Sequence, residues 1–220
     1  VRRLAPGAVV HTDAVQAAPW LDLAPLSACT DLMALSGHKF GGPKGVGVLR
    51  VRDGLAIGPL LFGGGQERDR RSGTHNVAGI VGLATALRIT VERRAAETAR
   101  VAALRDRLID GVLATCPGAV ETVERARKVA GSAHLCFDGC ESESLLFLLD
   151  QHGICVSAAS ACASGAMEPS HVLAAMGVDR GRAAGALRFS LGHTTTEAEV
   201  DHALAVLPAV VERVRSRRSS

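Results

Sequence analysis

The sequence predicts an α/β protein in which strands and helices alternate along the chain. Short β-branched runs bounded by Gly, Pro or polar residues are typical of buried strands. Longer segments carry apolar residues about one helical turn apart, which is typical of helices packed on a core. Hydrophobic residues make up 47% of the 220 residues. This content excludes a disordered chain and is enough for a packed core.

Three strands are expected in the first third of the chain, at residues 9–15, 32–35 and 45–51. The Gly-Gly-Pro sequence at 41–43 predicts the turn before the third strand. Three consecutive glycines at 63–65 predict a loop that bends sharply or lets another group approach its backbone.

A helical period then replaces the strand pattern. One helix is expected over Val77–Val91, and a second, with Val101, Leu104, Leu108 and Val112 on its apolar face, is expected to end near Pro117-Gly118. We interpret the charged stretch between them as a domain boundary, which divides the chain into residues 1–95 and 96–220.

Strands and helices alternate again in the second part. Predicted strands cover 133–137, 154–157 and 186–191, and predicted helices cover 142–151, 170–176 and 196–211. Thr196 and Glu199 have the spacing of a capping box at the start of the last helix.

Composition excludes several classes of protein. The net charge of +3 is too small to indicate nucleic-acid binding. No apolar run is long enough for a transmembrane helix, and the first residues do not resemble a secretory signal. The six cysteines are too sparse for a disulfide scaffold, so we expect free thiols in a reducing, cytoplasmic compartment. His134, Cys136 and Cys140 lack the spacing of a zinc site, and Cys136, with Cys29, Cys116 and Cys155, is expected to be a packed thiol.

Lys39 is the first residue that suggests chemistry. It follows a run that is expected to be buried, and burial lowers the pKa of a lysine and frees its amine to react with carbonyl compounds. The alternative is a surface turn in which Lys39 and Lys44 are solvated. A P-loop is a poor match, because Pro43 and Gly45 interrupt the required Gly-Lys-Ser/Thr order.

Asp13 ends the first predicted strand. A buried Asp in such a place can keep the ring nitrogen of pyridoxal phosphate (PLP) protonated. Its alternative role is to cap a helix that begins at Ala14. Gln16 either donates to the ring hydroxyl of the cofactor or faces solvent.

Five motifs occur in order over nearly the whole chain. They are His11-Thr-Asp13-Ala-Val-Gln16, Ser36-Gly-His38-Lys39-x-x-Gly-Pro43-Lys-Gly-x-Gly, Arg71-Ser72-Gly73-Thr74, Ser160-Ala161-Cys162-x-Ser164-Gly-x-x-Glu168-Pro169-Ser170-His171 and Leu187-Arg188-Phe189-Ser190-Leu191-Gly192. Together they resemble the PLP-dependent cysteine desulfurases of the NifS/IscS type, in the class V aminotransferase family. The resemblance implies the aspartate aminotransferase-like fold, fold type I. Residues 1–95 would then be the C-terminal part of the large PLP-binding domain and residues 96–220 the small α+β domain, with the N-terminal part of the family's large domain lacking.

The resemblance also implies a cofactor site. Lys39 would form the Schiff base with PLP, Asp13 would pair with the pyridine nitrogen, and Gln16 would contact the phenolic oxygen. Ser36 and His38 would bind the phosphate.

Three further residues take their roles from the same resemblance. Thr74 would reach the phosphate of a second subunit, which implies a homodimer, and Arg188 would hold the substrate carboxylate. Cys162 would be the nucleophile. Independently, the small residues at 157–166 predict a mobile, exposed loop around this thiol, although a buried strand with an inert cysteine is the alternative.

The implied activity is conversion of L-cysteine to L-alanine, with the sulfur kept on Cys162 as a persulfide. An acceptor protein, such as an iron–sulfur scaffold, would then take the sulfur for cluster assembly or thiolation. Two alternatives stay open: a related class V aminotransferase or selenocysteine lyase, and an inactive fragment that acts as a binding module. No metal, membrane or nucleic-acid partner is expected.

Overall fold

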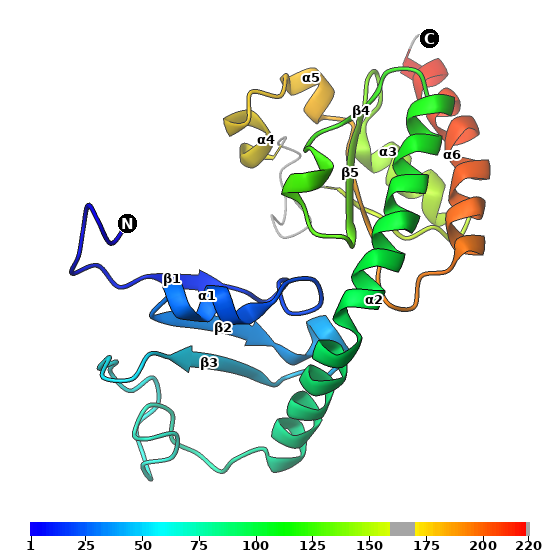
Figure 1. Ribbon diagram of the computed structural model, residues 1–220. Helices are drawn as coiled ribbons and strands as arrows, with labels where there is room; N and C mark the ends of the chain where they lie inside the picture. The colour runs from blue at the N-terminus through cyan, green and yellow to red at the C-terminus, as the bar shows by residue number, and fades with distance from the viewer. Residues whose placement is uncertain (159–169, 219–220) are drawn as a thin grey trace. The chain divides into compact units, whose positions relative to one another are not determined.

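The computed structural model describes residues 1–158 and 170–218 (Figure 1). The chain divides into two compact units, residues 1–96 and 97–220, each with its own sheet. Strands and helices alternate within both units, as the sequence predicts. Within the described ranges, no helix combines the length and the apolar character that crossing a membrane requires.

The first unit contains a three-stranded sheet in the order β1-β2-β3. Its strands are β1 (His11–Asp13), β2 (Leu32–Ser36) and β3 (Gly47–Val51). β1 runs parallel to β2, with Asp13 opposite Ala34, and β3 runs antiparallel to β2. Because parallel strands point the same way, the carboxyl ends of β1 and β2 lie at the same edge of the sheet.

The core of this unit covers one face of the sheet. Met33 and Leu35 alternate along β2 with less buried residues, and both pack in a cluster with Ala18, Phe40 and Leu83. α1 (Leu23–Cys29) and the first half of α2 (Val77–Thr115) supply the other apolar side chains of this cluster. β2 is therefore held in place by apolar packing on one of its faces.

The predicted break between two helices is wrong, because α2 is one continuous helix of 39 residues. No proline interrupts it, and its charged middle consists mainly of Ala, Arg and Glu, which are strong helix formers. Arg88 and Glu92 form an ion pair one turn apart, and Glu97 and Arg100 form another. A charged run of this kind is compatible both with the solvated face of a helix and with a linker between two helices.

The second unit is an antiparallel sheet in the order β4-β5-β7-β6. Its strands are β4 (Ala119–Glu121), β5 (Ser132–Phe137), β6 (Ser157–Ala158) and β7 (Ala186–Ser190). Its helices, besides the second half of α2, are α3 (Ser142–Asp150), α4 (His171–Ala175), α5 (Arg180–Ala183) and α6 (Glu197–Arg218). The capping box at α6 is confirmed, since Thr196 and Glu199 exchange hydrogen bonds of 2.7 and 3.3 Å.

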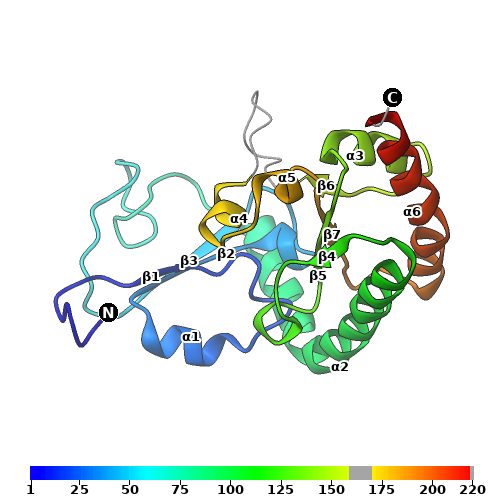
Figure 2. The same cartoon turned by 90° about the horizontal axis from the view of Figure 1, so that it is seen from above.

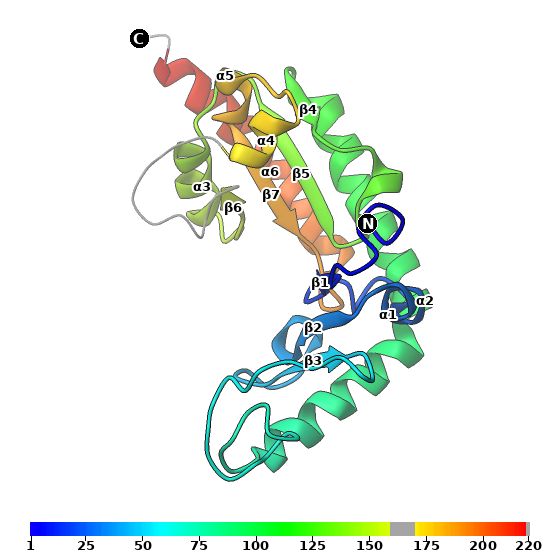
Figure 3. The same cartoon turned by 90° about the vertical axis from the view of Figure 1, so that its left-hand side faces the viewer.

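The two faces of this sheet are covered differently. The second half of α2 lies with α6 on one side, and α4 and α5 lie on the other (Figures 2 and 3). Leu135 and Leu187, on the α2 and α6 side, are completely buried. We call the opposite side the outer face. There α4 and α5 contribute Leu173 and Ala183 to a small apolar cluster with Cys136.

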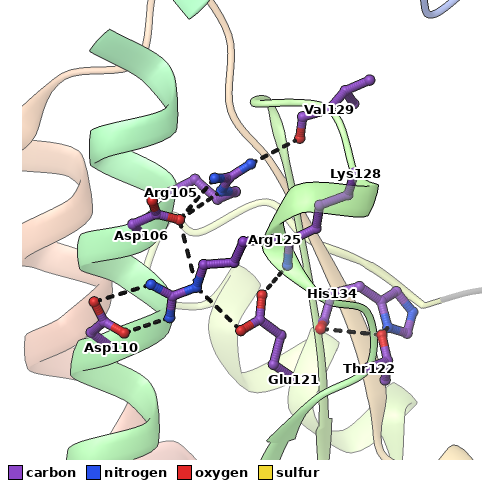
Figure 4. A network of polar contacts seen from close by, with 9 residues as sticks. All are labelled: Arg105, Asp106, Asp110, Glu121, Thr122, Arg125, Lys128, Val129 and His134. Atoms are coloured by element: carbon purple, nitrogen blue, oxygen red, sulfur yellow. Dashed lines mark hydrogen bonds and ion pairs between the residues drawn. The ribbon is translucent and has the colours of Figure 1, made fainter. Parts of the chain in front are cut away.

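A network of charged side chains joins α2 to the segment after β4 (Figure 4). Arg125, in the short 3₁₀ helix η2 (Arg125–Arg127), lies within ion-pair distance of Asp106, Asp110 and Glu121. Glu121 also pairs with Lys128. The hydrogen bond from Arg125 lowers the pKa of Asp110. The network holds the β4–β5 connection against α2.

Gly185, directly before β7, lies close to the backbone at the end of β5, and this close approach can be tested. A Cβ atom at this position would overlap the backbone carbonyl groups of Phe137 and Cys140, so Gly185→Ala should destabilise the native protein by about 1–3 kcal/mol through overpacking. Gly192→Ala is the control, because a Cβ atom there meets nothing within 4 Å. The free energies of unfolding are measured in urea. Equal stability of the two variants would contradict the close approach of Gly185 to the backbone of Phe137 and Cys140.

Candidate active site

Asp13 is the last residue of β1, and its carboxylate projects from the shared edge of β1 and β2. Its Oδ1 accepts a hydrogen bond of 3.0 Å from the backbone N–H of Val15, and the described chain offers Oδ2 no hydrogen bond. The expectation that Asp13 is buried is wrong for the described chain, where this residue is exposed. The helix-cap alternative is also wrong: turns follow Asp13, and the first helix begins at Leu23 with Asp22 as its cap.

Ser36 and His38 lie at the end of β2, beside the end of β1. The Ser36 hydroxyl lies 2.9 Å from His38 Nδ1. β2 ends in the short 3₁₀ helix η1 (Gly37–Phe40), and Gly41 closes this helix with a left-handed φ of 83°. The glycine is suited to this position because an L side chain would be strained there. This turn projects the side chains of residues 38 and 39 out of the sheet edge.

Lys39 is exposed within this turn. The expectation that it is buried is therefore wrong for the described chain, and the surface-turn alternative describes its surroundings better. Within the described residues, its ammonium group makes no hydrogen bond or ion pair. Gln16 is also exposed, in the turn after β1. The edge thus gathers a carboxylate, an amide, a hydroxyl, an imidazole and an amine.

Thr74 belongs to the same unit, in the long connection between β3 and α2. It is exposed, and no hydrogen bond links it to Ser36 or His38 in the described chain. Its assignment to a phosphate site in a second subunit stays a prediction.

Arg188 is the central residue of β7 in the second unit. It is exposed on the outer face, opposite His134 of β5 and Ser157 of β6. Nine other arginines form ion pairs with carboxylates in the described chain, whereas Arg188 forms none there. Its guanidinium is therefore available to bind an anion. The predicted nucleophile, Cys162, lies outside the described residues.

The other cysteines fall into two groups. Cys116 and Cys136 are buried, as predicted, and Cys140 is buried too, whereas Cys29 and Cys155 are exposed and their predicted burial is wrong. Burial raises the pKa of Cys136 to about 11 and also raises that of Cys116. No group of metal-ligating side chains occurs among the residues whose structure is described.

Comparison with known proteins decides the family. The model of the family named aminotransferase class-V matches residues 1–203. This chain belongs to that family. The predicted resemblance is confirmed at the family level, and most of the chain, including both units, contributes to the match.

Class-V relatives share extensive identity with this chain. It is 50% identical over 210 residues to an IscS-like cysteine desulfurase of Mycobacterium tuberculosis, a match that covers 95% of this chain and 53% of the relative. It is 48% identical over 211 residues to a cysteine desulfurase of Rhodobacter capsulatus, covering 96% and 55%. A solved structure titled NifS-like protein matches with a TM-score of 0.82 and 36% identity, covering 100% of this chain and 55% of that one.

These matches confirm the predicted fold class, a partial fold-type-I α/β architecture. The chain spans about half the length of the relatives it matches. The assignment of individual residues to catalytic roles is a separate question, which the fold alone does not answer.

The cysteines provide a test of burial in the native protein. At pH 8, iodoacetamide should label Cys155 much faster than Cys136, because only the thiolate reacts and a pKa of about 11 leaves little thiolate on Cys136. Peptide mass spectrometry over time measures both rates, and labelling in urea is the control in which they should become similar. Similar rates in the folded protein would contradict the burial of Cys136.

Proposed function

We propose that the native protein carrying this chain is a PLP-dependent cysteine desulfurase. It converts L-cysteine to L-alanine and holds the released sulfur on its own cysteine as a persulfide. The observation that carries this proposal is the position of Asp13, Ser36, His38 and Lys39 at the carboxyl ends of two adjacent parallel strands, with Ser36 and His38 in hydrogen-bond contact. The relatives named cysteine desulfurase support the choice of reaction.

The donor set at this edge fits PLP. The Asp13 Oδ2 atom and the Lys39 amine have no partner in the described chain, so both are available to a ligand. Asp13 would hold the pyridine nitrogen, Lys39 the aldehyde carbon, Gln16 the phenolic oxygen, and Ser36 with His38 the phosphate. When bound, PLP supplies a protonated ring that accepts electron density from the α-carbon of an amino acid.

The side chains of this protein divide the remaining tasks. The Asp13 carboxylate stabilises the proton on the ring nitrogen, and the Lys39 amine moves the proton at the substrate α-carbon. Arg188 binds the substrate carboxylate through its guanidinium. The Cys162 thiolate attacks the substrate sulfur, the Cβ–S bond breaks, and its electron pair stays with the carbon skeleton that is protonated to alanine. Sulfur is transferred without an external oxidant.

The organisation of the protein follows from the same proposal. The first unit would be the C-terminal part of the large PLP-binding domain, and the second unit the small domain that carries Cys162. Thr74 would complete the phosphate site of a second subunit in a homodimer. The persulfide would pass to an acceptor protein such as an iron–sulfur scaffold in the cytoplasm.

Lys39→Ala tests the cofactor site. We expect this variant of the native protein to lose the visible absorbance of bound PLP and to release sulfide from L-cysteine about 10³-fold more slowly, because the amine is both the attachment point and a proton carrier. Lys44→Ala is the matched control, since Lys44 is an exposed lysine of the same loop without an assigned role. Full activity of Lys39→Ala would overturn the proposal. Sulfide release by the 220-residue chain alone is measured in parallel. A chain that releases no sulfide by itself would fit the alternative of an inactive fragment that acts as a binding module.

Cys162→Ser separates a desulfurase from an aminotransferase, the second candidate that the family match itself favours. After addition of L-cysteine, the Cys162 peptide of the wild type should gain the mass of one sulfur atom, and the serine variant should release no sulfide. Cys155→Ser is the control and should retain activity. Unchanged turnover of Cys162→Ser would favour the aminotransferase, because amino transfer requires no thiol.

A further inference from the structure

A row of four polar residues crosses the outer face of the second sheet. Arg188 lies at its centre, paired in register with His134 on one side and Ser157 on the other. Thr122, directly after β4, continues the row beside His134, to whose carbonyl oxygen its backbone N–H donates a 3.2 Å hydrogen bond. Three strands and the residue that follows β4 therefore contribute to one row around a single guanidinium.

The row begins where the apolar cover of the outer face ends. On β5 and β7, the neighbouring pair Cys136 and Ala186 is buried under Leu173 and Ala183. His134 is only half-buried and Arg188 is exposed. A ligand can therefore reach the guanidinium, while apolar packing fixes the strands that carry both residues.

Thr122 fixes the imidazole of His134 (Figure 4). The Thr122 hydroxyl lies 2.8 Å from His134 Nδ1 and 3.4 Å from the His134 carbonyl oxygen. One ring nitrogen is thus engaged, and Nε2 remains for a neighbour. Burial is the largest cause that lowers the pKa of His134, and the positive charges of Arg188 and Lys128 lower it further. The ring is therefore neutral at neutral pH.

A neutral imidazole is a suitable neighbour for an arginine that must bind an anion. A carboxylate at this position would pair with the guanidinium and compete with the ligand, whereas a second cation would repel it. Directly opposite residues of an antiparallel pair have Cβ atoms about 5 Å apart. An imidazole at this separation can contact and orient the guanidinium without neutralising it.

We propose that His134, held by Thr122, is a positioning residue that orients Arg188 to receive the carboxylate of the amino-acid substrate. The identity of this carboxylate rests on the proposed function. The coupling between His134 and Arg188 does not, because it arises from the register and charges of the second unit alone.

The coupling is tested by titrating His134 in the native holoenzyme with histidine-selective NMR. Removing the neighbouring cation in Arg188→Gln should raise the pKa of His134, since a positive charge disfavours the imidazolium. Arg188→Lys, which keeps the charge, and Ser190→Ala, which alters the next outer-face residue of β7, should leave it close to the wild-type value. An unchanged pKa in Arg188→Gln would overturn the inference whether or not the protein is a desulfurase.

Kinetics test the positioning role. His134→Ala should raise KM for L-cysteine about tenfold with kcat nearly unchanged, because an interaction that serves binding alone is removed. His134→Gln, which keeps a polar group near the position of Nε2, should recover most of the affinity, and Thr122→Val should raise KM by a smaller factor. A lower melting temperature with unchanged KM in His134→Ala would show a purely structural role and overturn the inference. A wild type that releases no sulfide would instead refute the proposed function, and the titration would still decide the coupling.

Discussion

The parallel pairing of β1 with β2 is the constraint on which the candidate site depends. It places Asp13 opposite Ala34 and so brings the ends of both strands to one edge. Side chains alternate between the two faces of a strand, so a register slip of one residue would turn Asp13 to the other face. The buried Ala14, which follows Asp13, opposes such a slip of β1, because the slip would expose it. Burial beside Asp13 thus fixes the edge at which its carboxylate lies.

The sequence predicted which polar residues end the strands of the first sheet better than it predicted the burial of those residues. Asp13 and Ser36 end strands, and an apolar run followed by polar residues shows where a strand ends. Burial of Lys39 could not be predicted, because it depends on what packs over the turn and not on the preceding run. The continuous α2 was missed for a related reason: a charged segment such as 92–100 is compatible with a linker and with a solvated helix, and only the ion pairs in the structure distinguish them.

The outer face of the second sheet shows the limit of motif reading. Arg188 stands in a recognisable motif, whereas His134 attracted attention only for its closeness to Cys136 and Cys140 in sequence. In the structure, both cysteines are buried, and His134 pairs in register with Arg188. This pairing joins residues far apart in the chain, so it requires knowledge of strand order and register. Alternation within β5 was the available signal, since it separates His134 from the buried Leu135.

Carboxylates pair with cations on one side of the second sheet, whereas Arg188 on the other side forms no ion pair among the described residues. Arg125 and Lys128 pair with carboxylates at the α2 side of the sheet, whereas the two register partners of Arg188, His134 and Ser157, carry no carboxylate. The chain runs from β6, whose Ser157 pairs with Arg188, into the segment that contains Cys162, and returns in α4, which packs on the same face through Leu173. Both ends of that segment are therefore anchored to the sheet that carries the guanidinium.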